Sequence, residues 1–166
     1  MKLIKLTVLS SLIISCIIMF TSCEPDAEQK RTTDYSKTGI VMSSAQETPA
    51  NASTALGSMD VFYSKDTKIL SYTVTWSGLT GPVTAMHIHG LATPGFAAPV
   101  FQNIITSSGG IFTPGSAYGI TGKVSATLQV DGVTAKEEDI LAGKYYMNIH
   151  TTANPGGEIR GQIVFQ

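Results

Sequence analysis

Hydrophobic and polar residues alternate along two consecutive segments of the chain. In residues 55–63 every second position is small or apolar, and the same holds in residues 70–76, where the apolar positions are Leu70, Tyr72, Val74 and Trp76. A period of two places successive side chains on opposite faces of a β-strand, so both segments predict half-buried strands. The polar cluster at residues 64–67 predicts the turn between them.

Short segments of the same kind recur along the rest of the chain, separated by turns rich in glycine, proline and small polar residues. Further strands are expected near residues 38–46, 83–90, 99–105, 119–130, 144–151 and 158–165. Eight short strands joined by such turns predict an all-β fold, namely a two-sheet antiparallel β-sandwich with Greek-key connections.

One segment departs from the strand pattern. Thr134 and Glu137 have the spacing of a capping box, in which each side chain accepts a hydrogen bond from a backbone amide at the start of a helix. Gly143 can end that helix in the left-handed conformation. The sequence therefore predicts one short helix near residues 135–142, between two strands.

The N-terminus has the order of an export signal. Lys2 and Lys5 precede an apolar run over residues 6–20, and two small residues then lead to Cys23. The apolar run is short for a membrane span. A cysteine at this place resembles the lipobox of bacterial lipoproteins, so residues 1–22 are expected to be a lipoprotein signal peptide and Cys23 the lipidation site.

Two alternatives at the N-terminus stay open: lipidation at Cys16, and a plain cleaved signal without lipid. Residues 23–36 are polar and without periodicity, which is typical of a tether, and residues 37–166 would form the domain. The expected localisation is the bacterial cell envelope, with the protein exported and anchored by its lipid in the outer membrane. The membrane is the only partner that the sequence suggests.

Composition excludes several classes of function. Charged residues make up 14% of the chain and the formal net charge is −1, so no basic surface for nucleic acid is expected. Both cysteines precede residue 24, which leaves the domain without a disulfide or a thiolate metal site. No G-x-S-x-G motif is present, and no catalytic residues are assigned.

The three histidines are concentrated in two short segments. His87 and His89 lie two apart on an expected strand, so their side chains share a face about 6.6 Å apart. His150 has the same parity as Asn148 on another strand, opposite the apolar positions. If these strands are neighbours, three imidazoles form a metal site with an open coordination position. The alternative is that they are ordinary surface histidines.

Glu158 and Arg160 share a face by the same parity, close in sequence to His150. They are expected either to pair with each other across strands or, with Asn148, to be outer partners that orient an imidazole.

Several motifs follow one another along the expected domain: SAQETP at 44–49, residues 70–79 and 81–85, HIHG at 87–90, LAGKYYMNIHT at 141–151 and NPGGEIRGQI at 154–163. Taken together, they resemble the CHRD domain family. The resemblance runs from about residue 38 to the C-terminus. It implies a β-sandwich and supplies no biochemical activity.

A fainter resemblance links the histidine segments to copper–zinc superoxide dismutases. His87-Ile88-His89 is similar to their His-hydrophobic-His copper ligands, and Asn148-Ile149-His150 to the later strand that supplies the last copper histidine. Arg160 resembles the arginine that guides the anion. A bridging histidine, the zinc-loop histidines and the disulfide are missing. The resemblance therefore implies a copper site with only three of the histidine ligands, and without fast dismutase activity.

The leading expectation is a metal-binding lipoprotein of the envelope that captures or delivers copper. Copper is favoured over zinc because imidazole sites bind Cu(II) most tightly among divalent first-row ions. The second candidate is a non-catalytic structural or protein-binding module without a metal. A redox enzyme with superoxide dismutase-like activity is the third.

Overall fold

The computed structural model describes residues 34–107, 109–115 and 118–166. The expected signal peptide, both cysteines and most of the expected tether lie outside these residues. Within the described ranges, no helix has the length and apolar character needed to cross a membrane.

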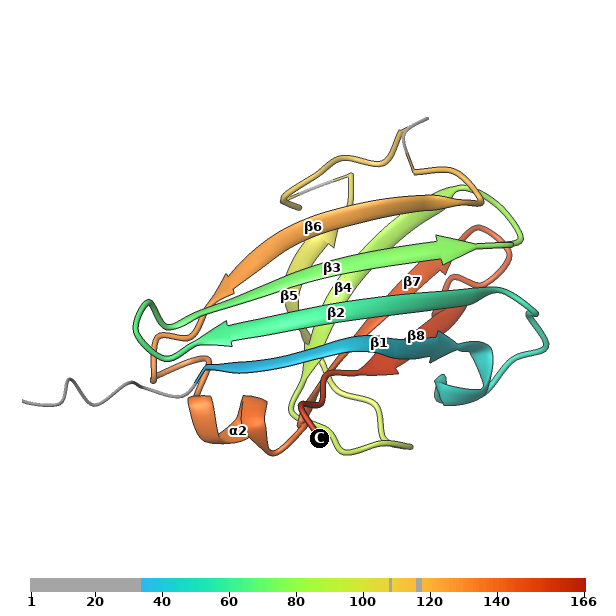
Figure 1. Cartoon of the computed structure of the whole chain (residues 1–166). Helices are drawn as coiled ribbons and strands as arrows, with labels where there is room; N and C mark the ends of the chain where they lie inside the picture. The colour runs from blue at the N-terminus through green and yellow to red at the C-terminus, as the bar shows by residue number, and fades with distance from the viewer. Residues whose placement is uncertain (1–33, 108, 116–117) are drawn as a thin grey trace, which may run out of the picture. The chain divides into compact units, whose positions relative to one another are not determined.

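Eight strands, one short α-helix and one 3₁₀-helix (Ser44–Gln46) make up the described fold (Figure 1). The strands are β1 (Tyr35–Ser43), β2 (Leu56–Ser64), β3 (Ile69–Ser77), β4 (Val83–Gly90), β5 (Val100–Ile105), β6 (Gly122–Gln129), β7 (Tyr145–Thr151) and β8 (Ile159–Gln162). All strand pairs are antiparallel. The predicted all-β class is therefore confirmed, although β6 and β8 are shorter than the sequence indicated.

The strands follow the order β5-β4-β7-β8-β1-β2-β3-β6 in one hydrogen-bonded sheet. The two sheets predicted from the sequence are joined, because β1 and β8 share the residue pair Ser43 and Arg160. In Figure 1, β6, β3 and β2 cross in front of β4, β5 and β7. The two ends of the order also meet: Gln102 on β5 accepts a hydrogen bond from the Tyr72 hydroxyl on β3 and donates one to the Thr127 carbonyl on β6.

The apolar positions of the alternating segments form the core, as their pattern predicted. Met59, Tyr63, Leu70 and Val74 are completely buried. Trp76 is also buried, and its indole N–H donates to the Gly119 carbonyl at 2.9 Å.

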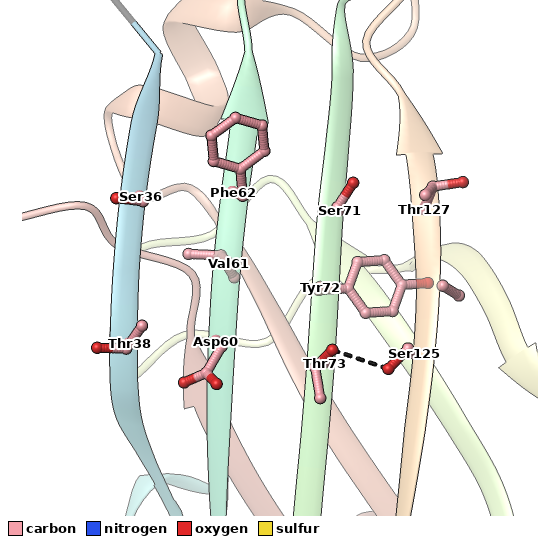
Figure 2. Close-up of a pocket in the computed structure, with 11 residues that line it drawn as sticks. Ser36, Thr38, Asp60, Val61, Phe62, Ser71, Tyr72, Thr73, Ser125 and Thr127 are labelled. Carbon is pink, nitrogen blue, oxygen red and sulfur yellow. Dashed lines mark hydrogen bonds between the residues drawn. The ribbon is translucent and has the colours of Figure 1, made fainter.

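The outer face of β1, β2, β3 and β6 is polar and open to solvent. Figure 2 shows a shallow depression of about 460 Å³ on this face. The Thr73 and Ser125 hydroxyls within it are hydrogen-bonded at 2.8 Å, and the exposed Phe62 also lines it. One buried and one solvated face is the usual arrangement of an antiparallel sheet. The other half of the sheet differs, because every residue of β7 and β8 is buried.

The helix predicted near residues 135–142 is α2 (Glu137–Leu141), but the predicted capping box is wrong. Lys136 is the N-cap residue and makes no side-chain cap. The Thr134 hydroxyl donates instead to the Asp131 carboxylate at 2.6 Å. That carboxylate also accepts three backbone amides, so a turn centred on Asp131 competes for the threonine. Glu137 accepts a hydrogen bond from Tyr63 instead of capping the helix.

The C-terminal end of α2 agrees with the prediction. Gly143 has a φ of +66°, its N–H donates to the Ile140 carbonyl, and the N–H of Lys144 donates to the Asp139 carbonyl. This pair of hydrogen bonds is the Schellman ending that glycine favours, and it directs the chain into β7.

Candidate metal centre

The strands that carry the histidines are neighbours. β4 pairs with β7 so that His87 lies opposite Asn148, and His89 lies opposite Tyr146. His150 pairs with Ala85 on the same ladder. Paired residues of antiparallel strands share a face, and residues two apart share it too. The three imidazoles therefore meet, and their potential ligand atoms all lie within 4.8 Å of one another.

Four polar atoms converge at the centre of this cluster. His87 Nδ1 lies 3.1 Å from His150 Nε2. The side-chain oxygen of Asn148 lies 2.9 Å from His150 Nε2 and 3.1 Å from His89 Nε2. Asn148 was expected to be an outer partner of the imidazoles, and its oxygen in fact lies among their nitrogens.

The outward nitrogens of two imidazoles face backbone carbonyl oxygens. His89 Nδ1 lies 2.9 Å from the Ala98 oxygen, and His150 Nδ1 lies 3.0 Å from the Pro155 oxygen. A carbonyl oxygen can only accept, so the proton of each neutral ring belongs on Nδ1. The Nε2 lone pairs of His89 and His150 then point into the cluster.

His89, His150 and Asn148 are buried although their side chains point away from the apolar core, whereas His87 is partly exposed. His89 and His150 are 9% and 8% exposed, and Asn148 is 2% exposed. The loop between β4 and β5 supplies the Ala98 carbonyl, and the turn between β7 and β8 supplies the Pro155 carbonyl. The strand parity predicted from the sequence is right, but the face it defines is not an open surface.

Burial lowers the pKa of two imidazoles. The pKa of His87 falls from 6.5 to about 4, mainly because burial disfavours its charged form, with further contributions from His150 and His89. Burial also lowers the pKa of His150, against a hydrogen bond to Pro155 that raises it. Both rings are therefore neutral near pH 7, which is the form that binds metals.

Tyr146 and Arg160 extend the cluster on one side. The Tyr146 ring stacks on His89, with ring centroids 4.8 Å apart and planes 1° from parallel. The guanidinium carbon of Arg160 lies 3.4 Å from the centroid of the same ring. Because β7 lies between β4 and β8, the tyrosine ring lies between the imidazole and the guanidinium. Arg160 and His89 thus each contact the Tyr146 ring, which separates them.

The remaining contacts of Arg160 are with neutral acceptors. Its guanidinium donates to the Thr48 hydroxyl at 3.3 Å, to the Phe96 carbonyl at 3.0 Å and to the Gln162 side-chain oxygen at 3.1 Å. Phe96 belongs to the same loop as Ala98, so Arg160 holds the loop that orients His89.

The Glu158 carboxylate is hydrogen-bonded to groups other than the imidazoles. It accepts hydrogen bonds from Ser53, Thr80 and Thr151, at distances from 2.5 to 2.8 Å. Among the described residues, no ion pair joins it to Arg160. Burial would raise the pKa of Glu158, but these hydrogen bonds together lower it.

Sequence reasoning missed Glu47 and Tyr146. Glu47 is 8% exposed, and its Oε1 atom has no hydrogen-bond partner. Burial raises the pKa of Glu47, while the nearby Asn148 amide and the charge of Arg160 lower it. Two signals pointed to these residues: Glu47 lies in the SAQETP motif, and Tyr146 has the parity of His150.

Fold and cluster together define an antiparallel β domain with a candidate three-histidine metal centre. Within that class, the chain belongs to the CHRD domain family, whose model matches residues 38–163. This match confirms the resemblance drawn from the sequence motifs. No curated protein and no solved structure matches the chain.

Proposed function

We propose that this protein is a lipid-anchored copper-binding protein of the bacterial envelope, which captures or delivers the metal through His87, His89 and His150. The observation that carries the proposal is the convergence of three imidazole nitrogens within 4.8 Å.

The chemistry of these side chains suits a transition metal. Two rings have their outer N–H groups directed at backbone carbonyls, the arrangement that fixes the tautomer of most metal-ligating histidines. Nitrogen donors without carboxylate or thiolate favour copper or zinc over magnesium or calcium, and copper stands highest in the affinity order. A metal bound there would be held by neutral side chains on two paired strands.

The N-terminal sequence supports an anchored protein. The signal-like residues 1–22, Cys23 and the polar residues up to 36 would place the domain at the surface of a membrane, with the outer membrane as the proposed location. A short tether limits how far a bound ion can travel with the protein. This suits exchange with a neighbouring component of the envelope.

A structural module is the second candidate, and one observation favours it. His150 lies at hydrogen-bonding distance from both His87 and Asn148, so the cluster could stabilise the pairing of β4 and β7 without a metal.

Copper titration of protein purified without a histidine tag separates the two candidates. We expect one Cu(II) per wild-type chain in optical and electron-paramagnetic spectra. Each of the variants His87→Ala, His89→Ala and His150→Ala should bind at least about tenfold more weakly. Gln129→Ala, which removes an exposed side chain on β6, is the matched control and should bind like the wild type. Equal binding by the triple histidine variant would leave only the structural module.

A further inference from the structure

The position expected to stay open in the three-histidine site is occupied by a protein atom. The side-chain oxygen of Asn148 lies 2.9 Å from His150 Nε2 and 3.1 Å from His89 Nε2. Asn148 comes from the middle of β7, between Tyr146 and His150, and its side chain is almost fully buried.

The spacing of these atoms is close to that of a tetrahedral metal site. Bonds of 2.0–2.1 Å to nitrogen or oxygen place the ligand atoms of a tetrahedron about 3.3–3.4 Å apart. Three of the separations in the cluster are 3.1, 2.9 and 3.1 Å. The separations between histidine ligand atoms extend to 4.8 Å, so an imidazole must move inward by up to about 1.4 Å to complete the tetrahedron.

The orientation of the Asn148 amide is set from its other side. A Cβ atom added at Gly157 would contact both the Glu47 carboxylate and Asn148 Nδ2. These two groups therefore lie close to each other, beside Gly157. The NH₂ group of Asn148 thus faces the Glu47 carboxylate. A carboxylate accepts from the NH₂ group and not from the oxygen, and so the Asn148 oxygen must face the imidazoles.

The cluster contains more acceptors than protons. When the ring protons are on Nδ1, His89 and His150 present only Nε2 lone pairs to the Asn148 oxygen, which is itself an acceptor. His87 can supply one proton, to His150. Buried acceptors that face one another without a donor are costly, and a cation among them removes the conflict.

We propose that Asn148 is the fourth ligand of the metal, and that the centre is a closed site of three nitrogens and one oxygen. This inference rests on the proposed metal binding and specifies its consequence. A site without an open coordination position holds a metal ion but prevents small anions and substrates from binding to that ion. Release would require a partner whose own ligand displaces the Asn148 oxygen, as expected for delivery and not for turnover.

The test uses cobalt(II) as the probe, because four-coordinate tetrahedral cobalt absorbs visible light far more strongly than six-coordinate cobalt. The wild-type protein should give the intense spectrum, and added azide should leave it unchanged. Asn148→Ala should bind cobalt at least about tenfold more weakly, and its spectrum should change with azide. Asn148→Asp keeps an oxygen donor and should bind at least as tightly as the wild type, again without response to azide.

Gln129→Ala is the matched control, since it removes an exposed amide on β6, a strand that pairs with β3 and carries none of the cluster residues. A wild-type spectrum that shifts with azide, or equal affinity of Asn148→Ala, would overturn the closed site while leaving metal binding intact. Absence of cobalt and copper binding by the wild type would overturn the proposed function itself. If Asn148→Ala does not fold, the response of the wild type and of Asn148→Asp to azide still shows whether the site is closed.

Discussion

Acidification should destabilise the metal-free protein, with His87 as the main cause. Burial next to two other imidazoles lowers the pKa of His87 from 6.5 to about 4 in the folded protein. In the unfolded chain the same ring is protonated below about pH 6.5. The unfolded state therefore binds more protons between these values, and the free energy of unfolding falls as the pH falls.

The size of the effect follows from the difference between the two pKa values. A difference of about 2.5 units corresponds to about 3.4 kcal/mol, and partial exposure of the ring reduces this to about 2–3 kcal/mol. The full stability is present above about pH 6.5 and this contribution is lost by about pH 4. His150, whose pKa is also lowered by burial, adds a loss of the same sign.

Urea denaturation of the metal-free protein at pH 7.5 and 4.5 measures the loss, with His87→Gln as the comparison. Glutamine keeps a polar side chain of similar reach but does not titrate, so the variant should lose less free energy of unfolding than the wild type over this interval. Glu47, whose pKa is raised, contributes with the opposite sign in both proteins and cancels in the comparison. Equal losses in wild type and His87→Gln would refute the assignment of the effect to His87.

Two further predictions concern the N-terminus and the independence of the domain. Cys23→Ala should release the protein from membranes or block its processing, as fractionation and mass spectrometry would report; if Cys16→Ala does so instead, the lipid is on Cys16. Residues 36–166, expressed alone, should give a β-rich circular dichroism spectrum and a cooperative thermal transition, because the described strands and core lie almost entirely within them. A largely helical or unfolded product would contradict the independence of this domain.

The strands were predictable because burial of one face imposes a period of two on the sequence. Residues 55–63 and 70–76 kept that period, and they form β2 and β3 with the expected side chains buried. The start of α2 was not predictable in the same way. Thr134 and Glu137 have the correct spacing for a capping box. The Thr134 hydroxyl is instead hydrogen-bonded to the nearby Asp131 carboxylate. Spacing alone does not rank such competing hydrogen bonds.

The three histidines were also predictable from parity, once their two strands were assumed to be neighbours. The residues around them were harder to predict from the sequence, because they contact the histidines from distant parts of the chain. Glu47 approaches Asn148 from the segment after β1, and Ala98 reaches His89 from the loop between β4 and β5. Alternation along a strand reports which face a residue occupies, and it does not report which loop later covers that face.

That coverage changes how the histidine variants must be interpreted. Strand parity alone would suggest that side chains pointing away from the core can be removed without harm to the fold. His150, however, is buried between the Pro155 carbonyl and Asn148, so His150→Ala would leave buried polar groups without partners. Such groups cost about 1–3 kcal/mol each, which would weaken metal binding through loss of structure alone. His87 is the most exposed of the three, so His87→Ala separates loss of a ligand from loss of the fold more cleanly than either buried histidine.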